Sequence, residues 1–334
     1  MFGMRFDLRA PGMTPTEIAR QYRAAIDMAR WADEKGALNI GLSEHHCSED
    51  GYLPSPLILA SAMAAVTRNV PLIVAAALLP MYDPVRLAEE MVVLDHISGG
   101  RVSYVLGIGY RPVEYQLYDL DYAQRGAIAD RKLEKLLEVL RRAGEAMLMP
   151  RITPSPFTAG RPRIMWGGAT KAAARRAGRH GLAFFAQTNT PGLAETYAAA
   201  AREAGFEPGQ CLLPSPEMPS IVFVHEDPDI GWREVGPYLL ADAVAYAEWN
   251  KDAQRPTVSL SKGRTIEELR AERGAHRVVD IAGALELVKR WGRLPLHPLC
   301  GGCPPDLAWS YLRRVGDQVL PALAHPGAGP GRLG

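Results

Sequence analysis

Glutamate and two histidines follow a short apolar stretch, in the run Ser43-Glu44-His45-His46. An imidazole gains and loses a proton near neutral pH, so a histidine at the end of a strand is a candidate general acid or base. Successive side chains of an extended segment point to opposite sides, so we expect at most one of the two histidines to face a site. For the same reason the pair is not expected to bind one metal ion. Two surface or hydrogen-bonded histidines remain the alternative.

A second candidate site is the run Gly167-Gly168-Ala169-Thr170, where an expected strand leads into an expected helix. Free backbone N–H groups, the helix dipole and the Thr170 hydroxyl would together favour an anion such as phosphate. Further positive charge on one face of this helix would come from Lys171, Arg175 and Arg179. A solvated basic helix with an ordinary threonine cap is the alternative.

Two further runs carry weaker signals. The small side chains of Ala75-Ala76-Ala77 would let a planar ligand approach the backbone, although plain core packing explains them equally well. The run Gly107-Ile108-Gly109 lacks the third glycine of a dinucleotide fingerprint and indicates a tight turn followed by a loop over residues 110–125. Arg111 in this loop could reach an anion or a carboxylate.

The chain has four cysteines, too few for a disulfide framework at this length. Cys300 and Cys303 form a Cys-x-x-Cys pair, but only His297 lies near enough in sequence to join them as a zinc ligand. Two prolines follow the pair, which disfavours a redox motif at the start of a helix. We therefore expect two thiols in a loop and no metal site.

The candidate residues follow segments that have the pattern of strands, and these strands alternate with helices. A long apolar run such as residues 70–79 is typical of a parallel strand covered on both faces. About eight strands over some 320 residues favour a (β/α)8 TIM barrel with loop insertions over a doubly wound sheet, which would carry a glycine-rich loop after its first strand. The expected strands are residues 4–8, 38–42, 70–79, 102–106, 163–166, 182–186, 220–225 and 294–299.

The domain organisation follows from this count. We expect one barrel domain over residues 1–325, with an irregular polar insertion near residues 252–277. The glycine- and proline-rich residues 326–334 are expected to form a disordered tail.

The composition of the chain excludes several functional classes. The 38 lysines and arginines balance 37 aspartates and glutamates, which disfavours nucleic acid as a partner. No apolar run reaches the roughly 20 residues of a membrane span, and the N-terminus lacks a signal-peptide core. We therefore expect a cytoplasmic protein with no membrane partner.

Taken in order, four runs resemble the bacterial luciferase-like monooxygenases, a family of flavin-dependent TIM barrels. The resemblance covers nearly the whole chain, and its most specific block lies between residues 83 and 101. The four runs are Ser43-Glu44-His45-His46, Asp83-Pro84-Val85-Arg86-Leu87-Ala88-Glu89-Glu90, Leu94-Asp95-His96-Ile97-Ser98-Gly99-Gly100-Arg101 and Trp166-Gly167-Gly168-Ala169-Thr170.

The resemblance implies a reduced flavin in the mouth of the barrel. His45 matches the family's catalytic histidine, and Ala75-Ala76 matches a non-prolyl cis peptide that supports the flavin ring. Thr170 matches the hydroxyl residue that holds the flavin phosphate, whereas position 173, where luciferases can carry a second hydroxyl residue, is alanine. Arg111 is matched to a phosphate-contacting arginine. The cofactor-binding residues expected on this basis are Ala75, Ala76, Gly107, Arg111, Gly168, Ala169 and Thr170.

The same resemblance implies an activity. We expect a two-component monooxygenase in which reduced FMN, delivered by a separate flavin reductase, and O2 oxidise a small organic substrate. An F420-dependent hydride-transfer oxidoreductase is one alternative, because F420 also carries a phosphate-bearing ribityl chain. A non-catalytic flavin-binding protein is another. The family further suggests a homodimer formed through the helices of the second and third βα units.

Overall fold

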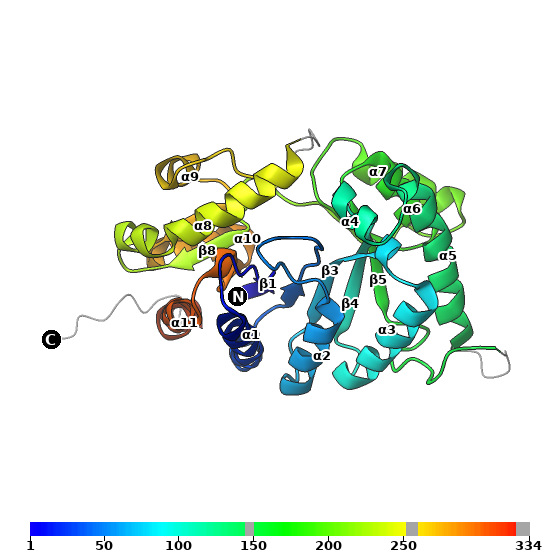
Figure 1. The fold of residues 1–334 in the computed structure, drawn as a ribbon, viewed down its shortest axis with the longest axis horizontal. Helices are drawn as coiled ribbons and strands as arrows, with labels where there is room; N and C mark the ends of the chain where they lie inside the picture. The colour runs from blue at the N-terminus through cyan, green and yellow to red at the C-terminus, as the bar shows by residue number, and fades with distance from the viewer. Residues whose placement is uncertain (144–149, 252–259, 325–334) are drawn as a thin grey trace. The chain divides into compact units, whose positions relative to one another are not determined.

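The computed structural model describes residues 1–143, 150–251 and 260–324, in two compact units (Figure 1). Unit 1 comprises Met1–Ile40 and Glu217–Gly334, and unit 2 comprises Gly41–Pro216. The expected tail 326–334 and the first part of the expected insertion, residues 252–259, lie outside the described residues. None of the helices in the described ranges is long and apolar enough to span a membrane.

Unit 2 alternates strands and helices, as the sequence predicts. Strands β3 to β7 pair in parallel and in sequence order, each with the next. Figure 1 shows helices α2, α3 and α5 beside strands β3, β4 and β5. The elements are β2 (Ile40–Leu42), α2 (Pro56–Val66), β3 (Leu72–Leu78), η1 (Leu79–Met81), α3 (Pro84–Ser98), β4 (Val102–Gly107), α4 (Pro112–Leu117), η2 (Tyr122–Gln124), α5 (Arg125–Ala143), β5 (Arg163–Gly168), α6 (Lys171–Arg179), β6 (Ala183–Ala186), α7 (Leu193–Glu203) and β7 (Cys211–Leu212).

Local signals explain where the helices of unit 2 begin and end. The Asp83 carboxylate caps α3 by accepting from the amides of Val85 and Arg86, both at 2.9 Å, and Pro84 occupies the first turn. Gly99 ends α3 in the left-handed conformation that glycine adopts at low cost. The loop expected over residues 110–125 contains α4 and η2 instead. Pro112 in the first turn of α4 and Glu114 close behind it are helix-start signals.

The block of residues 83–101 is a structural framework. Buried Asp95 accepts hydrogen bonds at 2.7 Å from both the amide and the hydroxyl of Thr158 and so fixes the link before β5. The Arg101 guanidinium donates to the carbonyls of Ala64 and Thr67, at 3.0 and 3.1 Å, and so covers the C-terminal end of α2. These contacts satisfy helix-end carbonyls that would otherwise lack partners.

Unit 1 contains the first and last segments of the chain. Strand β1 pairs in parallel with β10, and β8 pairs in parallel with β9. The expected strands near residues 4–8, 220–225 and 294–299 are confirmed. The elements are β1 (Phe2–Phe6), α1 (Pro15–Glu34), β8 (Ile221–Val224), α8 (Pro228–Asn250), α9 (Ile266–Glu272), β9 (His276–Val279), α10 (Ile281–Trp291), β10 (Leu294–Leu296), η3 (Cys300–Gly302), α11 (Pro305–Arg314), η4 (Val315–Val319) and α12 (Leu320–Ala324).

The irregular structure expected up to residue 277 is wrong for its last part, which holds α9 and the start of β9. Only Leu269 of helix α9 is buried. The helix therefore lacks the apolar stripe by which a helix is recognised in a sequence. Thr265 caps it by accepting from the amide of Glu268 at 3.1 Å. The threonine cap was therefore the sequence signal that could have indicated α9.

Candidate active site

Two histidine–carboxylate pairs lie in unit 2. Both histidines and Glu44 belong to the loop between β2 and α2, residues 43–55, which we call the histidine loop, and Glu114 belongs to α4. Nδ1 of His45 lies 2.8 Å from Oε1 of Glu114, and Nε2 of His46 lies 2.8 Å from Oε1 of Glu44. Both carboxylates are fully buried and both histidines nearly so. Each of the adjacent histidines thus bonds a different carboxylate, and the expectation that at most one of them faces a site stays a prediction.

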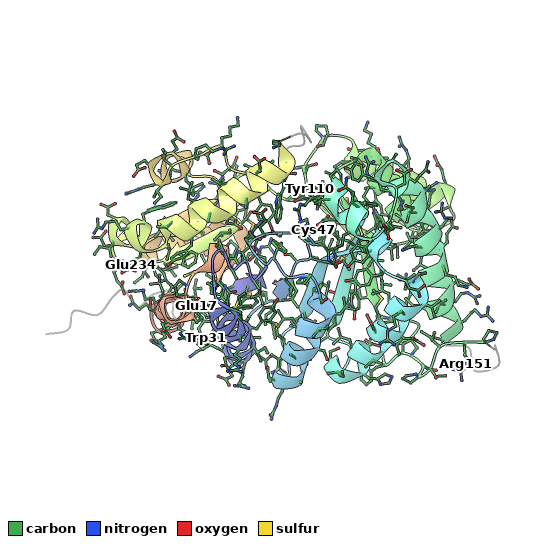
Figure 2. The ribbon with its side chains drawn as sticks, in the orientation of Figure 1. Glu17, Trp31, Cys47, Tyr110, Arg151 and Glu234 are labelled. Carbon is green, nitrogen blue, oxygen red and sulfur yellow. The ribbon has the colours of Figure 1, made fainter. Side chains whose placement is uncertain are left out.

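His45 is enclosed by aromatic rings. Its ring packs edge-to-face against Tyr52 and Tyr110, with centroids 4.9 and 5.3 Å away. The Tyr110 hydroxyl lies 3.4 Å from Nε2 of His45. Figure 2 labels Tyr110 and, in the histidine loop, Cys47. An ionised carboxylate can only accept, so this pairing favours the tautomer with the proton on Nδ1, in which Nε2 is the basic nitrogen.

Glu114 is a residue of this site that sequence reasoning missed. Its Oε1 also accepts from the His46 amide at 3.0 Å and lies 3.4 Å from the Arg111 guanidinium. Burial alone would raise the pKa of Glu114, but the hydrogen bonds and charges of His45, the His46 amide and Arg111 outweigh it and hold the pKa below its ordinary value. Glu114 is therefore an anion at neutral pH.

Arg111 immediately precedes α4, and its side chain belongs to the same cluster without forming a capping bond to the helix. Its guanidinium donates to the carbonyl of His46, and Nη2 donates to the carbonyl of Cys47 at 3.2 Å. The side chain is only 10% exposed. The structure thus shows Arg111 bound to the histidine loop and to Glu114, and its contact with a phosphate stays a prediction.

The second pair connects the histidine loop to β3. The other oxygen of Glu44 accepts from the Tyr82 hydroxyl at 2.8 Å and from the Leu78 amide at 3.2 Å. Burial raises the pKa of Glu44, although the donors around it, His46 first among them, act in the opposite direction. Glu44 and His46 therefore connect the histidine loop with the end of β3 at Leu78 and with the segment that carries Tyr82.

The expected cis peptide between Ala75 and Ala76 is present. The pairing of β3 with β4 shifts register at this point, between Ala75 and Ala77. A Cβ on Gly107, the last residue of β4, would lie 3.2 Å from Cβ of Ala76. The glycine thus keeps the space beside Ala76 free of a side chain.

The junction between β5 and α6 is built around two glycines. A Cβ on Gly167 would lie 2.8 Å from Cγ1 of Val105, and one on Gly168 would lie 2.5 Å from Cβ of Ala173. The Thr170 hydroxyl caps α6 by accepting from the Ala173 amide at 3.2 Å. Gly168, Ala169 and Thr170 are half-buried, which leaves the junction accessible at a helix N-terminus.

The cations near this junction have different surroundings. Buried Arg176 forms a bidentate ion pair with Asp130, at 2.6 and 3.0 Å, and Arg179 lies 3.6 Å from the same carboxylate. Lys171 lies beside Gly192, where an added Cβ would be 3.4 Å from Nζ. Because Asp130 neutralises charge at Arg176 and Arg179, Lys171 and exposed Arg175 remain the cations of this helix with no carboxylate partner in the described residues.

Cys300 and Cys303 are free, buried thiols in unit 1. Burial raises the pKa of Cys303 to about 12 and that of Cys300 well above its ordinary value, so both stay protonated and unreactive. Within the described ranges, no group of three histidine, cysteine or carboxylate side chains is placed to bind a metal ion.

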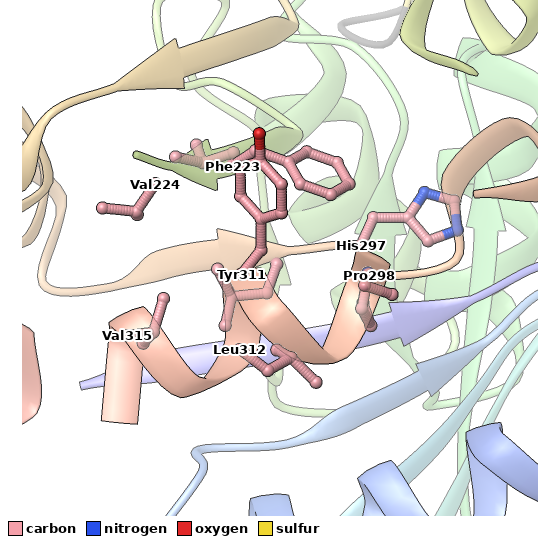
Figure 3. A pocket seen from close by; sticks show the side chains of 10 residues that line it. Phe223, Val224, His297, Pro298, Tyr311, Leu312 and Val315 are labelled. Carbon is pink, nitrogen blue, oxygen red and sulfur yellow. The ribbon is translucent and has the colours of Figure 1, made fainter. Parts of the chain in front are cut away.

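A small cavity lies in unit 1 between β8, β10 and α11 (Figure 3). Its volume is about 10 Å³, and apolar side chains such as Phe223 and Leu312 form most of its wall. Ligand pockets usually measure roughly 300–1,000 Å³. We therefore place the candidate site at the histidine loop and the β5–α6 junction of unit 2, and not at this cavity.

Comparison with known proteins identifies the family of this chain. The model of the family described as luciferase-like monooxygenase matches residues 1–288. The uncharacterized protein y4wF of Sinorhizobium fredii is 36% identical over 127 residues, which are 37% of this chain and 36% of that protein. The alkanal monooxygenase alpha chain of Photorhabdus luminescens is 28% identical over 120 residues, 36% of this chain and 32% of that one. The matched stretch spans about a third of the length of these curated relatives.

Solved structures match nearly the whole chain. Monooxygenase RslO1 from Streptomyces bottropensis has a TM-score of 0.68 at 21% identity, covering 97% of this chain and 100% of that one. The oxygenating constituent of 3,6-diketocamphane monooxygenase from Pseudomonas putida, in complex with FMN, has a TM-score of 0.65 at 19% identity, covering 96% and 98%. An F420-dependent secondary alcohol dehydrogenase reaches 0.60 at 15% identity, covering 92% and 97%. These likenesses confirm the predicted fold class, an α/β fold of the TIM-barrel type.

Proposed function

Because the chain belongs to the luciferase-like monooxygenase family, we propose that it is a flavin-dependent monooxygenase that uses reduced FMN and O2 to oxidise a small organic substrate. One observation carries the proposal. In unit 2, Gly107 lies beside Ala76 with no side chain between them, and the glycine junction capped by Thr170 leads into α6. The sequence resemblance assigns Ala76, Gly107, Gly168 and Thr170 to a flavin site.

The residues present fit such a cofactor. The two glycines of the β5–α6 junction have no room for a Cβ because they pack against Val105 and Ala173, and the half-buried residues 168–170 at the start of α6 are where a phosphate would bind. Thr170 would donate its hydroxyl to that phosphate, with the amides of Ala169 and Thr170 beside it and Lys171 supplying positive charge. Ala75, Ala76 and Gly107 would lie against the ring. When bound, FMN supplies the two-electron chemistry that activates O2, which no amino-acid side chain provides.

His45 is the residue we propose as catalytic. Its Nε2 is the basic nitrogen of a buried imidazole, able to accept or hold a proton in a place where water is scarce. The aromatic rings of Tyr52 and Tyr110 pack against this imidazole, which is 7% exposed.

We also propose two partners. A separate flavin reductase would deliver reduced FMN. A second copy of the chain would bind across α2 and α3, where the apolar side chains of Ile58, Val93 and Ile97 are 74%, 49% and 45% exposed. Sedimentation velocity at micromolar concentration should show a dimer, and a purely monomeric profile would contradict this arrangement.

The reaction is tested by oxygen transfer. The protein, FMN, NADH and a general flavin reductase would be incubated under ¹⁸O2 with a panel of aldehydes, ketones, thioethers and aromatic compounds. We expect one substrate class to gain a single ¹⁸O atom, and the His45→Ala variant to lose this activity. Reduction of a substrate with F420 as the only cofactor, and no ¹⁸O in any product, would instead support the F420-dependent alternative. Tight flavin binding with neither reaction would support a non-catalytic flavin-binding protein.

A further inference from the structure

The carboxylate of Glu114 has an uneven set of partners. Oε1 receives three contacts, from Nδ1 of His45, the His46 amide and the Arg111 guanidinium. Oε2 is buried and has no hydrogen-bond partner among the described residues. A Cβ built on Gly109 would lie 3.6 Å from Oε2, and the same point is within 3.7 Å of the Leu78 side chain. Among the described residues, the contacts of the Glu114 carboxylate are therefore made by Oε1, the oxygen that bonds His45.

Arg111 makes this arrangement rigid. One guanidinium contacts the carbonyls of His46 and Cys47 and the carboxylate of Glu114, so it joins the histidine loop to the first turn of α4. A buried carboxylate without a cation nearby would tend to take up a proton, because burial disfavours its charged form. Arg111 offsets that tendency at Glu114.

The neighbouring pair lacks this feature. Glu44 is held by the Tyr82 hydroxyl, the Leu78 amide and His46, and none of these partners in the described chain is an arginine or a lysine. Burial raises the pKa of Glu44, whereas the pKa of Glu114 is lowered despite burial, first by the hydrogen bond and charge of His45 and further by the His46 amide and the charge of Arg111. Two histidines that are adjacent in sequence thus face carboxylates whose pKa values are shifted in opposite directions.

We propose that Glu114, supported by Arg111, is the positioning residue that sets the protonation of His45, keeping the proton on Nδ1 and the lone pair on Nε2. The catalytic importance of this role rests on the proposed function, but the proton position itself does not. Glu114 acts through His45 and needs no contact with substrate or cofactor. Which of the two imidazole nitrogens carries the proton depends on the hydrogen bonds that the ring makes with its partners.

The test is ¹⁵N NMR of the imidazoles in the full-length, flavin-free protein labelled at histidine. Wild type, Glu114→Gln and Glu44→Gln would each be titrated over pH, with His45→Asn and His46→Asn used to assign the signals. In the wild type we expect His45 to carry its proton on Nδ1. Replacing the Glu114 anion by a neutral amide should lower the pH at which His45 protonates by about 1–3 pH units, the usual effect of a nearby opposite charge.

Glu44→Gln is the matched control, because it makes the same chemical change at the adjacent histidine. It should alter the signals of His46 and leave the midpoint of the His45 titration within a few tenths of a pH unit. A Glu114→Asp variant should restore part of the wild-type titration. An unchanged His45 titration in a folded Glu114→Gln protein, or a wild-type His45 protonated on Nε2, would overturn the proposal.

These experiments distinguish a failure of the role proposed for Glu114 from a failure of the proposed monooxygenase function. A shifted His45 titration together with no oxygen transfer in the wild type would keep Glu114 as the positioning residue and reject the monooxygenase. Oxygen transfer with the wild type whose pH profile is unchanged in Glu114→Gln would keep the monooxygenase and reject the role of Glu114. If Glu114→Gln does not fold, Arg111→Gln, which leaves the carboxylate in place but removes its cation, should move the His45 titration as well, and an unmoved titration would again overturn the proposal.

Discussion

The Asp95 carboxylate accepts both the amide and the hydroxyl of Thr158, each at 2.7 Å, although the two residues lie far apart in sequence. Asp95 is buried at the end of α3, and Thr158 belongs to the link that precedes β5. The contact therefore fixes the entry of the strand that ends at the proposed phosphate junction.

Asp95→Ala should destabilise the protein without a direct effect on the site. Hydrogen bonds to a charged group contribute about 1.5–3 kcal/mol each, and part of this is recovered when the half-buried Thr158 groups reach water. We expect the free energy of unfolding in urea to fall by about 2–4 kcal/mol. Flavin affinity of the folded variant should stay within a few fold of wild type, and Asp95→Asn should lose less stability. An unaltered urea midpoint in Asp95→Ala would show that this contact carries no stability.

Thr170→Val separates helix capping from ligand binding. Loss of an N-cap hydroxyl costs about 1 kcal/mol of stability. If the same hydroxyl also holds a phosphate, its loss should weaken binding of reduced FMN by about tenfold or more. Thr265→Val, which removes the corresponding cap of α9 in unit 1, is the control and should cost similar stability with unchanged affinity. Equal flavin affinity in the wild type and Thr170→Val, measured by anaerobic fluorescence titration, would remove Thr170 from the cofactor site.

Glu44 predicts a pH dependence of stability. Burial raises its pKa in the folded protein above the ordinary value of 4.5, so folding favours the protonated carboxyl. The stabilisation is complete below pH 4.5 and is lost as the pH rises through the folded-state pKa. For each unit by which the folded-state pKa exceeds the unfolded-state pKa, about 1.4 kcal/mol of stability is lost as the pH rises through both values.

The stability of wild type relative to Glu44→Gln should therefore fall as the pH rises above about 4.5 and level off once the pH has passed the folded-state pKa of Glu44. Urea denaturation at a series of pH values measures this difference. Glu49→Gln, at an exposed position in the same loop, should run parallel to the wild type. A difference between wild type and Glu44→Gln that grows with pH would mean that the folded protein favours the charged carboxylate at position 44.

Much of the fold could be predicted because the strands of unit 2 are apolar and bounded by glycine and proline. Residues 70–79, for example, contain β3 almost in full. Helix α9 escaped prediction because its single buried residue gives no periodic pattern. Strand β7 spans only Cys211–Leu212, too short for any alternation to show.

The site was predictable in part. The run Ser43-Glu44-His45-His46 indicated that the two histidines differ, but the carboxylate that holds His45 lies 69 positions later in the chain. No local spacing connects Glu114 with His45; only the packing of α4 against the histidine loop brings them together. The block of residues 83–101 shows the reverse case, since it was the most specific mark of the family and its contacts at Asp95 and Arg101 are structural.

The central claim, that unit 2 holds reduced FMN, is tested most directly by anaerobic titration of the purified protein with FMNH2 and, in parallel, with reduced F420. The account predicts saturable binding of FMNH2 at one site per chain, weakened in Thr170→Val and retained in Thr265→Val. Tight binding of F420 with no binding of FMNH2 would contradict it.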